Sequence, residues 1–164
     1  MTLRPTGSLE PTPHGRDLIL TRTYRAPIED VWASITESER TARWFGPWQG
    51  AAGPGRTVRV QLSYEDGQPW SEYTIDTCVP PRHLALRATD ESGSWHLEVT
   101  LTEQGGQTEL VFVHHLESAE QVPEIGPGWE YYLDALGASR TDARRPDFDD
   151  YYPAMREYYT NLDG

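Results

Sequence analysis

Hydrophobic residues alternate with polar residues in a series of short runs along the chain. In the run over residues 95–102, Trp95, Leu97, Val99 and Leu101 fall on one side of an extended backbone, and polar residues fall on the other. Turns that contain glycine or proline separate these runs. The pattern predicts β-strands over residues 17–25, 57–64, 70–79, 83–89, 95–102 and 109–116.

Directly after Pro27, apolar residues recur at intervals of three and four positions, which is typical of the buried face of a helix. Proline suits the first position of a helix, because the N–H that it lacks would have no partner there. We therefore expect a helix over residues 27–36. A second, shorter helix is expected over residues 38–45, with Ser38 as its N-cap.

Two more helical patterns follow the strands. Trp129 and Leu133 lie on one stripe of an expected helix over residues 127–139, and a further short helix is expected over residues 151–162. Between the last strand and Trp129 we expect a loop over residues 117–126. The stretch that precedes the first strand holds three prolines and no periodicity, which favours irregular backbone.

The order of these elements predicts an α+β fold. A sheet with one apolar face and a late amphipathic helix bury each other best when the helix lies across the sheet. We divide the chain into a mobile N-terminal arm (residues 1–16), a single domain (17–139) and a C-terminal extension with a short helix (140–164).

Several short motifs resemble the signature of the START-like (SRPBCC) superfamily, and most closely its branch of heat-shock chaperone ATPase activator homologues. The resemblance implies the helix-grip fold, which is also that of the birch pollen allergen: a curved antiparallel sheet wrapped around a C-terminal helix, with two short helices after the first strand. It also implies an apolar ligand cavity between sheet and helix. The residues that carry it include Arg22, Ala26, Pro27, Val31, Trp32, Thr36, Trp44, Phe45, Gly105, Gly106, Thr108, Gly128 and Trp129.

Composition narrows the function. The 164 residues carry a net charge of −12, and an acidic surface repels nucleic acids and anionic membranes. The one cysteine, Cys78, excludes a disulfide within the chain, which fits a cytoplasmic protein. No run has the length of a membrane span, so we expect neither a nucleic-acid partner nor membrane insertion.

The resemblance and the supply of aromatic residues predict which side chains would bind a small apolar or amphipathic molecule. A core filled by these same side chains is the alternative. No cluster has the spacing of a metal site or a nucleophile, so we expect no metal, no cofactor and no catalytic residue. The candidate ligand-binding residues are Tyr64, Tyr73, Trp95, Leu97, Phe112, His114, Trp129, Leu133 and Leu136.

Two polar residues have open roles. His114 shares a strand face with Phe112, where a neutral imidazole would bind a ligand or transfer a proton. It would equally serve as a core histidine that is hydrogen-bonded to backbone or tyrosine, or lie in water at the strand end. Arg22 would pair with Glu72 or Asp76 across the sheet, or bind a ligand carboxylate.

Three functions therefore remain open. The first is a binding protein for a lipid-like, isoprenoid or polyketide-like molecule. The second is a polyketide cyclase or aromatase that uses the same cavity, and the third is a protein-interaction module that resembles the chaperone activator. The tyrosine-rich C-terminal extension would cap the cavity, form a homodimer interface, or cover the edge of the sheet.

Overall fold

The computed structural model describes residues 4–90, 93–141 and 143–162. Its centre is one antiparallel sheet in the order β1-β2-β8-β7-β6-β5-β4-β3, so the first long strand, β2, pairs with the last, β8. The strands are β1 (Ser8–Thr12), β2 (Gly15–Tyr24), β3 (Trp48–Gln49), β4 (Thr57–Gln61), β5 (Trp70–Val79), β6 (His83–Asp90), β7 (Gly93–Gln104) and β8 (Gln107–Leu116).

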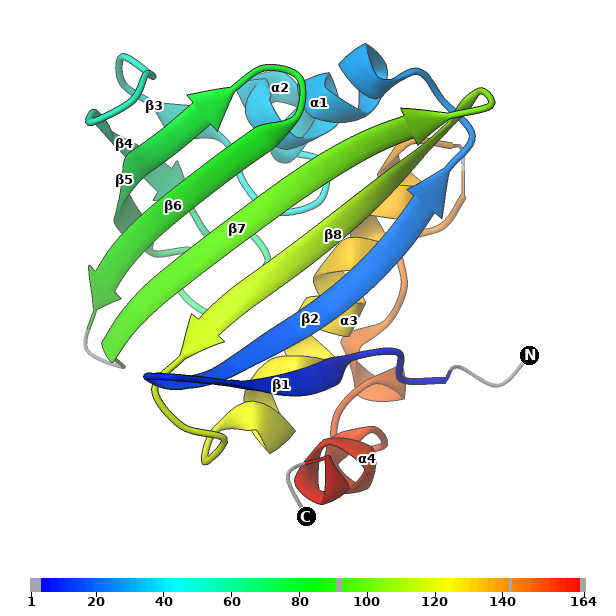
Figure 1. Cartoon of the computed structure of the whole chain (residues 1–164). Coiled ribbons are helices and arrows are strands. Elements are labelled where there is room, and N and C mark those ends of the chain that lie inside the picture. The colour runs from blue at the N-terminus through cyan, green and yellow to red at the C-terminus, as the bar shows by residue number, and fades with distance from the viewer. Residues whose placement is uncertain (1–3, 91–92, 142, 163–164) are drawn as a thin grey trace.

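Helix α3 lies across the concave face of this sheet, and Figure 1 shows it behind strands β8 and β2. Helices α1 and α2 sit at one end of the sheet, and α4 lies near β1 at the other. This arrangement is the helix-grip fold expected from the sequence, and the α+β prediction is confirmed. The helices are α1 (Ile28–Thr36), α2 (Ser38–Thr41), α3 (Val122–Ser139), α4 (Arg156–Asn161) and the 3-10 turn η1 (Phe148–Asp150).

The alternation of the strands places their apolar residues as the sequence predicts. In β8 the side chains of Thr108, Leu110, Phe112 and His114 are buried, whereas those between them are exposed or half-buried. The inner face of the sheet packs on one stripe of α3. The core residues of these two surfaces include Leu18, Leu20, Leu97, Leu101, Leu110, Phe112, Leu133 and Leu136.

The N-terminal segment and the end of β4 differ from expectation. Residues 8–12 form β1 and pair with β2, although their composition favours irregular backbone. An edge strand tolerates proline, so Pro11 does not prevent this pairing. Strand β4 ends at Gln61, before Tyr64, because the chain turns back through Gly67, whose φ is +78°.

The helices differ mainly at their ends. Helix α2 spans four residues instead of eight, and Ser38 is not its N-cap: the Ser38 hydroxyl donates to the carbonyl of Trp48 (2.9 Å) and accepts from the N–H of Trp48 (2.8 Å). Helix α3 begins at Val122, inside the expected loop. Pro123 fits its first turn, and burial of the first turns against the core stabilises the helix despite Pro127 within it.

The C-terminal extension packs on its own chain. Tyr151, Met155 and Tyr159 are buried in the same core as the sheet, and α4 contacts α3. No described residue after Leu136 belongs to the wall of the cavity described below, so the extension does not cap it in this structure. The division of the chain at residues 16 and 139 stays a prediction.

Candidate functional site

An apolar cavity of about 170 Å³ lies between the sheet and α3. Its wall comes from the inner faces of β4 to β8, from α3, and from the segment of α1, α2 and the loop that follows. The wall offers few polar atoms, on residues such as Thr36 and Thr41. A volume of this size, without polar partners, does not favour ordered water.

Six of the nine residues proposed from the sequence line this cavity. They come from two neighbouring strands, from β5 and from α3, and the alternation of the strands together with the helical stripe brings them together. They are Tyr73, Leu97, Phe112, Trp129, Leu133 and Leu136. Trp129 is central, because its ring packs on Phe112 (centroid distance 4.5 Å) and stacks on Phe45 (6.4 Å).

Tyr64 lies outside the cavity. Because β4 ends before it, Tyr64 is exposed on a turn, where its hydroxyl donates to the backbone carbonyls of Ala42 (3.1 Å) and Arg43 (3.2 Å). The guanidinium of Arg145 lies 3.5 Å from the centre of its ring. Tyr64 therefore joins the extension to the α2 region by a cation–π contact.

The candidate residues proposed from the sequence omit a part of the wall that comes from α1, β6, Cys78 of β5 and the segment between α2 and β4. The indole N–H of Trp44 donates to the Ser34 carbonyl (2.9 Å), and that of Trp48 donates to the Thr36 carbonyl (2.8 Å). These bonds fix both indoles against the cavity. For Leu84 and Leu86, the alternation of apolar and polar residues in β6 was an available signal. The omitted wall residues include Ile35, Phe45, Trp48, Ala52, Cys78, Leu84 and Leu86.

His114 lies behind this wall. It is 1% exposed, its Nδ1 accepts a hydrogen bond from the indole N–H of Trp129 (3.1 Å), and its ring stacks on Trp95 (5.1 Å). Neither His114 nor Trp95 is part of the cavity wall. Because Nδ1 accepts, the neutral imidazole carries its proton on Nε2, which is buried without a partner among the described residues, as is Nε1 of Trp95.

Burial lowers the pKa of His114 to about 4, with smaller effects from His115 and His96. We predict that the His114 ring stays neutral down to pH 5. Between pH 6.5 and 4 the unfolded chain binds a proton that the folded chain does not, so stability falls as the pH falls, by at most about 3 kcal/mol. Titration of the histidine ring signals by NMR measures this directly.

His115 supplies the internal control for that titration. It lies on the outer face of β8, where burial alone would lower its pKa, but hydrogen bonds that its ring donates to the carboxylates of Glu98 and Asp17 outweigh burial and raise that pKa. The two adjacent histidines should therefore titrate on opposite sides of the ordinary value. A His114 midpoint above pH 6 would contradict the burial that the structure gives it.

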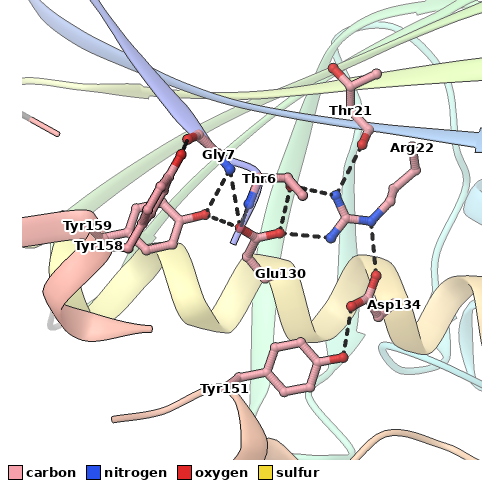
Figure 2. A network of polar contacts seen from close by, with 9 residues as sticks. All are labelled: Thr6, Gly7, Thr21, Arg22, Glu130, Asp134, Tyr151, Tyr158 and Tyr159. Atoms are coloured by element: carbon pink, nitrogen blue, oxygen red, sulfur yellow. Dashed lines mark hydrogen bonds and ion pairs between the residues drawn. The ribbon is translucent and has the colours of Figure 1, made fainter. Parts of the chain in front are cut away.

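A second polar cluster joins both ends of the chain to α3 (Figure 2). We call it the Glu130 network, and it consists of Thr6, Gly7, Arg22, Glu130, Asp134, Tyr151 and Tyr159. Glu130 is 1% exposed and accepts hydrogen bonds from the N–H of Thr6 (2.5 Å), from Nη2 of Arg22 (2.8 Å) and from the Tyr159 hydroxyl. Burial alone would raise its pKa, but the bonds from Tyr159, Arg22 and Thr6 outweigh burial and lower it.

Arg22 therefore has partners other than those expected. It forms ion pairs with Glu130 (2.8 Å) and Asp134 (2.9 Å) of α3, because β2 turns this side chain inward, toward the helix. The predicted pairing with Glu72 or Asp76 is wrong, and Asp76 pairs instead with Arg87. With two carboxylates already bound, Arg22 does not face the cavity and is not part of its wall.

Two glycines make room for the tyrosine in this network. A methyl group added at Gly7 or at Gly126 would overlap the ring of Tyr159. Tyr159 therefore occupies a slot between the N-terminal segment and α3, and its hydroxyl reaches Glu130 there. The Glu130 network is a structural clasp, since every one of its carboxylates and its guanidinium has a partner within the chain.

Within the part of the chain that the structure describes, no group of three or more histidine, cysteine and carboxylate residues lies close enough to hold a metal ion. None of the helices described combines the length and the apolar character that a membrane crossing requires.

Residues 25–139 match a family model described as activator of Hsp90 ATPase homolog 1-like protein. No protein of curated function matches the chain in sequence. Among solved structures, the crystal structure of CalU16 from Micromonospora echinospora is similar, with a TM-score of 0.77 and 27% identity over 97% of this chain and 96% of that one.

Two more distant structures share the fold. DynU16, a protein from the dynemicin biosynthetic locus, has a TM-score of 0.70 and 21% identity over 80% of this chain and 50% of its own. The Aha1 dimer from Colwellia psychrerythraea has a TM-score of 0.62 and 14% identity over 75% of this chain and 94% of its own. At these identities the likeness concerns the fold alone.

Proposed function

The chain belongs to the family of activator of Hsp90 ATPase homolog 1-like proteins, and from this premise we propose that it binds a small apolar molecule in the cavity under α3. The observation that carries the proposal is the wall of the cavity: apolar side chains from strands β3 to β8, from α3 and from the α1–α2 segment line one space of about 170 Å³. Concave, mostly apolar pockets of this kind are typical of small-molecule sites.

The volume limits the ligand. Pockets for drug-sized molecules begin at about 300 Å³, whereas an engineered apolar cavity of about 150 Å³ binds benzene. A molecule held wholly inside therefore has one or two rings. A lipid-like, isoprenoid or polyketide-like ligand, the classes expected from the sequence, would place such a part in the cavity and extend past exposed Ala52, which belongs to the wall.

The proposal predicts that a two-ring aromatic probe, naphthalene, binds at one saturable site and raises the melting temperature. The Val99→Phe variant fills the cavity and should weaken naphthalene binding about tenfold or more, because the added ring takes the space of the ligand. Isothermal titration calorimetry and thermal unfolding measure the two effects.

The matched control is Val111→Phe, the same exchange on the outer face of the sheet, away from the cavity. It should bind naphthalene as the unchanged protein does. Equal binding by both variants, or the absence of saturable binding by the unchanged protein, would overturn the proposal.

An enzymatic role receives no support from a specific residue. His114, which the cyclase alternative requires, is hydrogen-bonded to Trp129 but is not part of the cavity wall, and burial keeps its ring neutral. The homodimer, the chaperone contact and the cytoplasmic location stay predictions. Sedimentation of the full chain tests the homodimer.

A further inference from the structure

A second pocket, of a different chemical character, lies where α1 and α2 meet the end of α3. It has a volume of about 200 Å³ and is lined by Asp30, Ser34, Arg40, Arg43, Ser139 and Arg140. We call it the arginine pocket. None of its residues lines the apolar cavity, although α1 and α2 contribute to both walls.

The pocket concentrates positive charge on an acidic protein. Three guanidinium groups and one carboxylate line it, whereas the whole chain has 14 basic and 26 acidic residues and a net charge of −12. Glu37 lies outside the lining, 3.9 Å from Arg40, and is largely exposed. Even when Glu37 is counted, the pocket keeps one positive charge without a counter-charge.

Asp30 holds two of the arginines in place. Its Oδ1 binds Arg40 (2.8 Å) and its Oδ2 binds Arg140 (2.8 Å), while Nη1 of Arg140 also donates to the Ser34 hydroxyl (2.6 Å). The side chain of Arg140 is only 10% exposed. These bonds orient both guanidinium groups before any ligand arrives, which reduces the entropy that binding would cost.

The third arginine has no such role. The guanidinium of Arg43 forms no hydrogen bond or ion pair with any residue that the structure describes, yet it lines the pocket. Arg40 and Arg140 connect the helices through Asp30, whereas the exposed side chain of Arg43 makes no such connection among the described residues. A free cation beside two oriented ones is the arrangement that an anion with several oxygens would complete.

We propose that the arginine pocket binds the phosphate group of a small phosphorylated molecule. A phosphate monoester carries a charge of about −1.5 to −2 at pH 7, which complements three arginines and one aspartate. Guanidinium groups match the geometry of phosphate oxygens through paired N–H donors. The charge of −12 opposes approach to an anionic lipid surface, which favours a free ligand over a lipid headgroup.

The test is titration with phenyl phosphate and with inorganic phosphate, at constant ionic strength adjusted with chloride and followed by amide NMR shifts. Both should bind saturably and shift the signals of residues around Arg40 and Arg140. The Arg43→Gln variant should bind about tenfold more weakly, since it loses one charged hydrogen-bond donor, and Arg43→Lys should recover part of the loss. Thermal unfolding confirms that both variants fold.

Arg59→Gln, an exposed arginine of β4 outside the pocket, is the matched control and should bind as the unchanged protein does. Three results would overturn the proposal: no saturable binding, an equal loss in Arg43→Gln and Arg59→Gln, or binding only to vesicles that contain phosphatidic acid. The last result would assign the pocket to a lipid headgroup.

Discussion

The Glu130→Ala variant is expected to lose about 3 to 5 kcal/mol of its free energy of unfolding, the range seen when one partner of a buried ion pair is removed. Glu130 is almost fully buried, and Arg22, with 15% of its side chain exposed, would keep only Asp134 as a counter-charge. The N–H groups of Thr6 and Gly7 and the Tyr159 hydroxyl would also lose their common acceptor. Each buried donor left without a partner adds to the cost.

Urea unfolding followed by tryptophan fluorescence measures this loss. Glu124→Ala is the matched control, because Glu124 lies on the same helix and pairs with Arg156 at the surface, where the pair is worth about 1 kcal/mol or less. Glu130→Gln should fall between the two, since the amide keeps the shape and part of the acceptors. A loss from Glu130→Ala no larger than that from Glu124→Ala would show that the Glu130 network does not stabilise the fold.

The contacts of Arg22 show which features of the structure the sequence pattern predicts and which it does not. Alternation in β2 places Arg22 on the same face as Leu18 and Leu20, and this face turns inward in the structure. Glu130 and Asp134 are four residues apart, so they share one face of α3 beside its apolar stripe. The pairing of these elements depends on how α3 crosses the sheet, which no local pattern specifies.

The strands were predictable because an antiparallel sheet with one buried face imposes a period of two on the sequence. Local composition gave the wrong secondary structure where tertiary contacts outweigh the local preference of the backbone. Residues 8–12 form β1 by pairing with β2, and α3 extends back to Val122 because its first turns are buried. At residues 8–12 the prolines suggested irregular backbone, but an edge strand tolerates proline. At the start of α3, Pro123 fits the first helical turn.

The wall of the cavity likewise has a part that the sequence pattern predicts and a part that it does not. Residues such as Leu97 and Phe112 follow from alternation, and Leu133 follows from the helical stripe. The indoles of Trp44 and Trp48 reach the cavity from the turn after α2 and from the two-residue strand β3, where hydrogen bonds to α1 carbonyls fix them. No periodicity encodes such positions, so this part of the wall becomes visible only in the structure.

Trp129→Ala is expected to have the second large effect, a loss of about 3 to 5 kcal/mol, as for other buried tryptophans. Trp129 packs on Phe112 and Phe45, and its N–H is the partner of His114. Removal of the indole joins its volume to the cavity and leaves Nδ1 of His114 without a donor. The variant should therefore be less stable and, at the same time, accept a larger ligand.

The acceptance of a larger ligand by Trp129→Ala distinguishes a cavity that binds ligands from a defect in core packing. Naphthalene and the four-ring probe pyrene can be compared by calorimetry at a temperature where the variant is folded: the unchanged protein should prefer naphthalene, and Trp129→Ala should bind pyrene more tightly than the unchanged protein does. Trp70→Ala is the control, because Trp70 is an exposed tryptophan beneath Arg59, outside the cavity, and its loss should change neither property by much. If Trp129→Ala loses stability but excludes pyrene, the side chains around the indole have closed over the space. The interior would then be a core whose side chains rearrange to fill space, and this result would contradict the proposal that the cavity binds a ligand.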